Sequence, residues 1–171
     1  EALSSDPDVT VNGNAFTLIS GWPDYSYRYT AQPGESEGLQ AIAIVATDLA
    51  GNQRIDGSLS VDIDFTPPTL TPLSIEPRPV EPNETLTIVF ESNEPLDTAQ
   101  TAVSIDGNPA TLVGQSGLVY TYQYPVIGME ESSFVNVNGY DLAGNHRWNY
   151  QGWGDIEVTG EDQYGNPGRG S

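Results

Sequence analysis

The feature that most constrains the fold of this chain is an internal repeat. Residues 9–18 align with residues 103–112, and the loop at 48–52 has the same sequence, Asp-Leu-Ala-Gly-Asn, as the loop at 141–145. Two sets of tyrosines also align, at Tyr25, Tyr27 and Tyr29 and at Tyr120, Tyr122 and Tyr124. The offset stays between 93 and 95 residues. A period of this length is typical of one all-β sandwich, whereas solenoid repeats are shorter.

Alternating residue types predict strands in the second copy. Leu86, Ile88 and Phe90 alternate with threonine and valine, and Gly, Asn, Asp and Pro punctuate the chain between such runs. Helical periodicity of useful length is absent from the sequence. About seven strands are expected, at residues 69–76, 84–91, 101–106, 109–114, 118–124, 133–140 and 147–158. The predicted fold class is therefore all-β, with two immunoglobulin-like β-sandwiches in tandem.

The domain boundaries follow from the repeat and from the stiff Pro67-Pro68 linker. We expect an incomplete immunoglobulin-like repeat at 1–66, a complete repeat at 67–160, and a flexible, acidic and glycine-rich tail at 161–171. The first copy starts at the equivalent of about residue 95. It therefore lacks counterparts of the two opening strands of the second copy.

The two missing strands would leave an open apolar face and unpaired backbone edges in the first copy. The run at 41–46, Ala-Ile-Ala-Ile-Val-Ala, is apolar on both faces, as expected of a central strand. Two explanations stay open: the chain is a fragment of a longer protein, or strands of an identical subunit complete the first copy by β-augmentation. The second would join subunits head to tail into filaments. The tail lacks alternating apolar residues, which excludes it as the donor strand.

At this point the sequence resembles a known family. Phe-Glu-Ser-Asn-Glu-Pro at 90–95, the Asp-Leu-Ala-Gly-Asn loop at 141–145, and an aspartate-rich strand running into Thr-Pro-Pro at 66–68 are similar to the bacterial immunoglobulin-like repeats of large secreted and surface-anchored proteins. The resemblance implies a sandwich fold with neighbouring repeats as partners. Such repeats serve as stalks, adhesin extenders or spacers in secreted enzymes, so the resemblance does not choose an activity.

Charge and composition exclude several function classes. The 171 residues include no cysteine, no lysine, and five arginines against 24 aspartates and glutamates, which gives a formal net charge of −19. Such a chain repels phosphate backbones and anionic lipid head groups, so we expect neither nucleic-acid binding nor membrane insertion. The absence of cysteine permits an extracellular or cell-surface location. Strong acidity also fits a saline habitat, in which case the charge reflects the environment and not a function.

The repeated loop has two interpretations. Its aspartate can cap a tight turn by accepting backbone N–H bonds, and this role needs no ligand. The loop also offers the hard oxygen donors that Ca²⁺ prefers. In an immunoglobulin-like sandwich the loops near 91–94 and 141–145 lie at the end where the chain enters. The predicted Ca²⁺ ligands are Asp62, Asp64, Glu91, Glu94, Asp141 and Asn145, with a second metal loop at Asp48 and Asn52.

Aromatic side chains are the other candidate site. Tyr120, Tyr122 and Tyr124 line one face of a strand, and Trp148 and Trp153 follow the second Asp-Leu-Ala-Gly-Asn loop. Such a platform could stack a glycan, although cross-strand aromatic packing explains the same pattern. With a single histidine and no cysteine, the sequence offers no recognisable catalytic constellation, so we expect no enzyme.

These observations predict an extracellular structural module, a stalk, spacer or fibre subunit of a prokaryotic surface protein, stiffened by Ca²⁺ and able to polymerise by strand donation. Its partners would be neighbouring immunoglobulin-like repeats or identical subunits. One alternative is an adhesin domain that binds a glycan or a surface protein through its Tyr and Trp faces. Another is an accessory domain of a secreted hydrolase.

Overall fold

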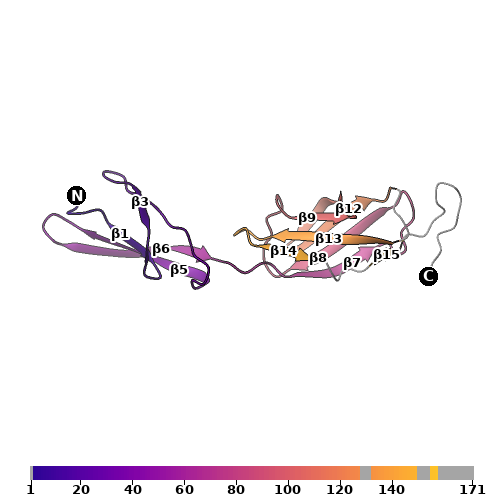
Figure 1. Cartoon of the computed structure of the whole chain (residues 1–171), viewed down its shortest axis with the longest axis horizontal. Coiled ribbons are helices and arrows are strands. Elements are labelled where there is room, and N and C mark those ends of the chain that lie inside the picture. The colour runs from indigo at the N-terminus through magenta and orange to yellow at the C-terminus, as the bar shows by residue number, and fades with distance from the viewer. Residues whose placement is uncertain (1, 128–131, 150–154, 158–171) are drawn as a thin grey trace. The chain divides into compact units, whose positions relative to one another are not determined.

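The fold is described from a computed structural model, which covers residues 2–127, 132–149 and 155–157 (Figure 1). Within these residues the chain forms fifteen β-strands and no helix, which confirms the all-β fold class. The same residues accordingly contain no helix long and apolar enough to cross a membrane. The chain divides into two compact units, Glu1–Phe65 and Thr66–Ser171, one residue before the predicted boundary.

The second unit contains two antiparallel sheets. One sheet has the strand order β11-β12-β8-β7, and the other has the order β10-β9-β13-β14, with β15 also paired to β13. The strand bounds are β7 Leu70–Glu76, β8 Thr85–Ser92, β9 Ala102–Ile105, β10 Asn108–Pro109, β11 Thr111–Ser116, β12 Val119–Pro125, β13 Ser132–Tyr140, β14 His146–Asn149 and β15 Asp155–Glu157. Six of the seven predicted strands lie close to observed ones. The seventh, predicted at 147–158, corresponds to the two strands β14 and β15, which pair with different parts of β13.

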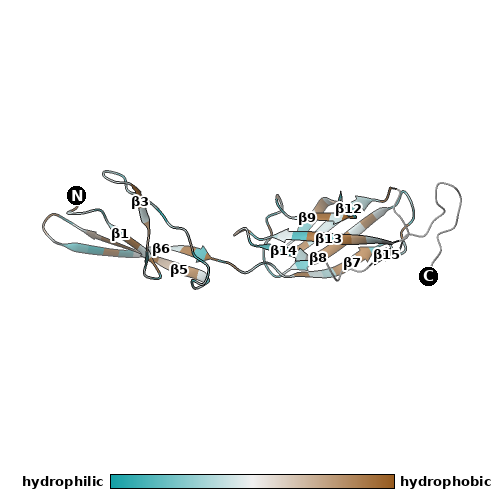
Figure 2. Ribbon diagram, in the orientation of Figure 1, coloured by the Kyte–Doolittle hydropathy of each residue, from teal (hydrophilic) through white to brown (hydrophobic). Residues whose placement is uncertain are grey.

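One core joins the two sheets of the second unit. The alternation along β8 places Leu86, Ile88 and Phe90 inside with no exposed surface, as the period-2 pattern predicts. The rings of Tyr120 and Tyr122, from β12, stack on Phe90 at centroid distances of 5.5 and 5.9 Å. In Figure 2 the hydrophobic residues of this unit are banded along its strands, alternating with hydrophilic ones. The strands therefore form a sandwich whose core is rich in aromatic rings.

The first unit contains one sheet and a separate hairpin. The sheet has the strand order β2-β1-β5-β6, and β3 pairs only with β4 among the described residues. The strand bounds are β1 Asp8–Val11, β2 Asn14–Ala15, β3 Thr17–Ser20, β4 Ser26–Arg28, β5 Gly38–Thr47 and β6 Gln53–Ile63. As the sequence predicts, the apolar run at 41–46 lies in a central strand, because β5 is paired on both sides.

Strand pairing shows that this sheet repeats the β10-β9-β13-β14 sheet. In the first unit Val9 pairs with Ile44, and Val11 pairs with Ile42. The equivalent pairs in the second unit are Val103 with Val137 and Ile105 with Val135. The tight turns after the first strand also agree, because both adopt positive φ at two successive residues: Asn12 and Gly13, and Asp106 and Gly107. The sequence repeat is therefore a repeat of register as well as of residues.

The first unit differs from the second in what covers its sheet. Its β3–β4 hairpin corresponds to β11–β12, since Leu18 pairs with Tyr27 as Leu112 pairs with Tyr122. Within the described residues the first unit has no counterpart of β7 or β8, which agrees with the two opening strands that the sequence alignment finds missing. Figure 1 shows the hairpin beside the β1-β5-β6 sheet, whereas strands form both layers of the second unit.

Candidate functional site

The two Asp-Leu-Ala-Gly-Asn loops are closed by their own aspartates. Asp48 accepts hydrogen bonds from the backbone N–H of Ala50 and of Asn52, each at 2.8 Å, and from the Asn52 side-chain amide at 2.7 Å. Gly51 takes a φ of 87°, a conformation that disfavours residues with a side chain. The turn-capping interpretation thus accounts for both Asp48 and Asn52, the pair predicted as a second metal loop.

The hydrogen bonds lower the pKa of the Asp48 carboxyl. The largest cause is the bond from the Asn52 side chain, followed by the bond from the Asn52 backbone. Both favour the charged carboxylate, because an N–H group donates to it. Asp48 is therefore a carboxylate committed to its turn.

The loop of the second unit has the same closure in a more buried setting. Asp141 accepts bonds from the backbone N–H of Asn145 at 2.8 Å and from its side-chain amide at 2.9 Å. Asp141 is only 1% exposed, and its backbone pairs with Leu96. The predicted ligand Asn145 therefore directs its amide nitrogen to Asp141, and positions that carboxylate.

Two acidic side chains of the second unit come together near the Asp141 loop. Glu94 and Asp141 each offer a carboxylate oxygen, and the two oxygens lie within 4.8 Å of each other. Asp64, another predicted ligand, follows the end of β6 and belongs to the first unit. Asp141 is buried and Glu94 is half-buried. Like charges this close repel one another, and a divalent cation would relieve that repulsion.

Two further predicted ligands lie on strands. Asp62 lies within β6 of the first unit and is exposed. Glu91 is exposed because it lies between the buried residues Phe90 and Ser92 on β8, so its side chain faces the outer side of the sheet. That all six predicted ligands bind one ion stays a prediction.

The tyrosines of β12 form no exposed platform. Tyr120, Tyr122 and Tyr124 are 0%, 2% and 7% exposed, and all three belong to the hydrophobic core. The Tyr120 hydroxyl accepts a hydrogen bond from the backbone N–H of Leu96 at 2.8 Å, and burial raises the pKa of Tyr122 to about 12. The predicted ligand-binding role of these three residues is therefore wrong, because the strand turns them inward.

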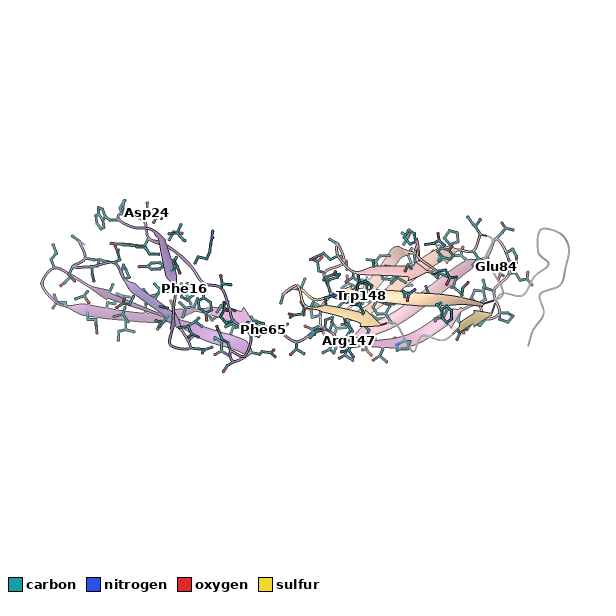
Figure 3. All side chains as sticks on the ribbon, viewed as in Figure 1. Phe16, Asp24, Phe65, Glu84, Arg147 and Trp148 are labelled. Atoms are coloured by element: carbon teal, nitrogen blue, oxygen red, sulfur yellow. The ribbon has the colours of Figure 1, made fainter. Side chains whose placement is uncertain are left out.

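Of the two tryptophans in that prediction, one lies on the surface. Trp148 on β14 is 68% exposed (Figure 3). Its ring lies edge-on to that of His146, with centroids 4.9 Å apart. Trp153 lies outside the described residues. A single exposed ring is a weaker glycan platform than the predicted row of aromatics. Among the described residues of that prediction, Trp148 is the one whose ring lies at the surface.

The first unit has an apolar surface whose individual residues the sequence analysis did not identify. We call it the open face; cross-strand pairing places five residues on one side of its sheet, namely Val9, Val11, Ile42, Ile44 and Leu59. Val9 and Val11 on β1 are buried, at 8% and 1% exposed, so the exposed part of this face is on β5 and β6. Ile42 and Ile44 are half-buried, whereas their equivalents Val135 and Val137 are 5% and 1% exposed. Leu59 is 54% exposed. The alternating pattern of β5 could have identified its two residues, but their exposure depends on what covers the sheet, and the described residues of the first unit include no counterpart of β7 or β8.

Comparison with known proteins gives a partial relative. No protein-family model matches the sequence. The chain is 35% identical over 103 residues to Bacillopeptidase F of Bacillus subtilis; the match covers 58% of this chain and 7% of that protein. Among solved structures, a Bacteroides ovatus surface protein, SGBP-B of a mixed-linkage glucan utilization locus in complex with a heptasaccharide, has a TM-score of 0.30 at 17% identity, covering 89% of this chain and 38% of that one.

Proposed function

We propose that this chain is a non-catalytic structural module of an extracellular or cell-surface protein, in which immunoglobulin-like sandwiches follow one another as a stalk or spacer. The observation that carries the proposal is the repeated strand register of the two units. Repeating a sandwich extends a chain without adding a new site. The repeated loops support the same role, because the Asp48 and Asp141 side chains are used to close turns.

Single-molecule force spectroscopy of the intact chain tests a spacer role. A load-bearing sandwich should resist extension and then unfold in one step. Extending residues 70–157, which include β7 to β15, should release roughly 300 Å of chain at about 3.5 Å per residue. Featureless extension of this unit at low force, together with saturable binding of a glycan, would contradict the proposal. In that case Trp148→Ala should abolish the binding, and the adhesin alternative would be favoured.

A second candidate function is an accessory domain of a secreted hydrolase. The partial match to Bacillopeptidase F favours it, because the chain corresponds to a small part of a protein whose name denotes a peptidase. Antibodies raised against this chain should then capture, from the source cells, a larger polypeptide with peptidase activity. Capture of a long polypeptide without such activity, containing further copies of the repeat, would favour the stalk.

We extend the structural proposal to Ca²⁺, with Glu94 and Asp141 of the second unit as its ligands. The close carboxylates and the net charge of −19 support it. Ca²⁺ at a hundredfold excess over its Kd should stabilise the folded chain by about 2.7 kcal/mol. Thermal unfolding in CaCl₂, in EDTA and in NaCl of matched ionic strength measures the effect.

Two variants make the Ca²⁺ test specific. Glu94→Gln should remove most of the CaCl₂-dependent rise in Tm, because it deletes one carboxylate of the cluster. Glu91→Gln is the matched control, since Glu91 is an exposed carboxylate three residues earlier that lies outside the cluster. Equal Tm values in CaCl₂ and NaCl would show that salt only screens the repulsion between these carboxylates and that they form no specific Ca²⁺ site. Equal effects of the two variants would refute this set of ligands.

A further inference from the structure

The outer side of the β9-β13-β14 sheet in the second unit carries aromatic rings and amides. Alternation along β13 buries Val135 and Val137, so the residues between and beside them point away from the core. Pairing of β14 with β13 adds two residues of β14 to the same outer side. We call this surface the aromatic face; it consists of Phe134, Asn136, Asn138, Tyr140, His146 and Trp148.

Three rings of the aromatic face contact one another. The rings of Tyr140 and His146 stack with centroids 4.4 Å apart, and the His146 ring meets the Trp148 ring edge-on. The Nε2–H group of His146 also donates a hydrogen bond to the side-chain carbonyl of Asn138. These contacts fix the side chains before a ligand binds, and a surface ordered in advance loses less conformational entropy on binding.

Two rings of the aromatic face are largely exposed, with amides between them. Phe134 and Trp148 are 57% and 68% exposed. Trp148 pairs with Asn138, four residues beyond Phe134 on β13, so the two positions are roughly 13 Å apart along the strand. Asn136 and Asn138 lie along this interval, and within the described residues neither side-chain NH₂ group has a hydrogen-bond partner. Both groups are therefore available to donate to a ligand.

The internal repeat shows that strand pairing does not require these rings. In the first unit the equivalent positions hold Ala41, Val45, Thr47, Gln53 and Ile55, in place of Phe134, Asn138, Tyr140, His146 and Trp148. The first unit thus forms the same pairings without an aromatic residue at these positions. The outward positions of β8 and β12, on the opposing sheet of the second unit, hold threonine, valine, proline, glutamate and glutamine. The aromatic residues are therefore particular to one face of one unit.

The chemistry of the aromatic face fits an uncharged glycan. The outward positions that the structure describes on β9, β13 and β14 include no arginine, aspartate or glutamate, although the chain has a formal net charge of −19. Exposed rings offer an apolar stacking surface, and amides hydrogen-bond to hydroxyl groups. The net charge repels an anionic polysaccharide, so a neutral one is the better match.

We propose that the aromatic face binds an uncharged polysaccharide. Phe134 and Trp148 stack on two separate sugar units of one glycan chain, and the amides of Asn136 and Asn138 hydrogen-bond to the hydroxyl groups between them. This inference does not depend on the stalk role, because force spectroscopy tests mechanical resistance separately from binding. It also differs from the predicted platform of β12 tyrosines, since among the described residues of that prediction only Trp148 belongs to the aromatic face.

Affinity electrophoresis of the full chain tests the proposal, with hydroxyethyl cellulose, xyloglucan, laminarin or galactomannan in the gel. At least one of these neutral polysaccharides should slow the migration of the chain. Trp148→Ile, which follows the residue at the equivalent position of the first unit, should weaken the binding about tenfold or more, because it removes an aromatic anchor. Trp22→Ile is the matched control and should leave binding unchanged, since Trp22 is 64% exposed but belongs to the first unit. Hydrogen exchange of β13 shows that each variant is folded.

The length of the glycan tests the arrangement of the two exposed rings. A hexasaccharide of the polysaccharide that binds should have a higher affinity than its disaccharide, because only the longer chain spans roughly 13 Å and contacts both rings. Phe134→Ala should remove that advantage. Titrations followed by the NMR signal of the Trp148 indole measure both affinities.

Four results would overturn the proposal. The first is unchanged migration in all four neutral polysaccharides. The second is equal weakening of binding by Trp148→Ile and by Trp22→Ile, which would place the binding site outside the aromatic face. The third is stronger retardation by polygalacturonate than by any neutral polysaccharide, which would make the ligand an anionic glycan. The fourth is equal affinity for the hexasaccharide and the disaccharide, which would refute simultaneous contact with both rings.

Discussion

The two units of this chain contain the same strand pairings but differ in burial. Val9 with Ile44 and Val103 with Val137 are equivalent pairs in equivalent sheets. In the second unit a whole second layer covers the pair, and in the first unit a short hairpin covers only part of the sheet. The comparison teaches that local sequence sets strand register, whereas burial depends on partners supplied by more distant parts of the chain.

The aromatic residues show the same contrast. Tyr120 and Tyr122 of β12 stack on Phe90 of β8 within the core of the second unit; the two strands are four apart in sequence and adjacent in the sheet. In the first unit Tyr29 contacts Phe16 with ring centroids 4.9 Å apart, but the described residues of that unit include no counterpart of Phe90. An identical tyrosine pattern therefore gives a core in one unit and a half-exposed surface in the other.

Among the predicted changes, removal of the Phe90 ring from the core of the second unit should cause the largest loss of stability. Phe90→Ala should lower the free energy of unfolding of the second unit by about 3–5 kcal/mol, because it opens a cavity beside two stacked tyrosines. Urea unfolding, followed by hydrogen exchange of β13, measures the loss. Phe134→Ala is the matched control, since Phe134 is 57% exposed and should cost less than about 1 kcal/mol. Equal losses of stability from the two variants would show that Phe90 contributes no more to the core than the exposed Phe134 does.

A matched pair of truncations compares the two sheets directly. Val137→Ala should destabilise the second unit by about 2 kcal/mol, because it removes two buried methyl groups. Ile44→Ala removes more carbon from the equivalent position of the first unit, yet should cost less than about 1 kcal/mol, since Ile44 is half-buried. Local exchange of β13 and β5 reports each loss. A larger loss for Ile44→Ala would contradict the open face.

The sequence predicted much of this fold for identifiable reasons. The period-2 pattern and the turn residues predicted six of the strands of the second unit, and the repeat located the missing strands of the first. The alternation that buries Tyr120 and leaves Glu91 exposed was also present in the sequence. Which face of a strand points inward, however, depends on the opposing sheet, so the candidate sites were the less accurate part. Glu94 and Asp141, on different loops, came together as sandwich topology predicts.

Protonation of Asp48, which closes the turn of the first unit, should change stability least among these predictions. Hydrogen bonds lower the folded-state pKa of Asp48, so its stabilising contribution is present above the unfolded value of about 3.9 and is lost as pH falls through the lower, folded value. Asp48→Asn should therefore flatten the fall in first-unit stability below pH of about 4, relative to the unmodified chain. Carbon NMR of the Asp48 carboxyl, with Asp62→Asn as an exposed-carboxylate control, checks it. An Asp48 pKa equal to the unfolded value would show that the carboxylate does not cap the turn.

Hydrogen exchange of the unmodified chain tests the central claim most directly, because it compares equivalent central strands within one molecule. Both β5 and β13 are paired on two sides, so their backbone hydrogen bonds are similar and differ mainly in the layer that covers them. We predict that β5 amides exchange on the order of 100-fold faster than β13 amides. Equal protection of the two strands would show that the first unit is already a complete sandwich, and would contradict the account.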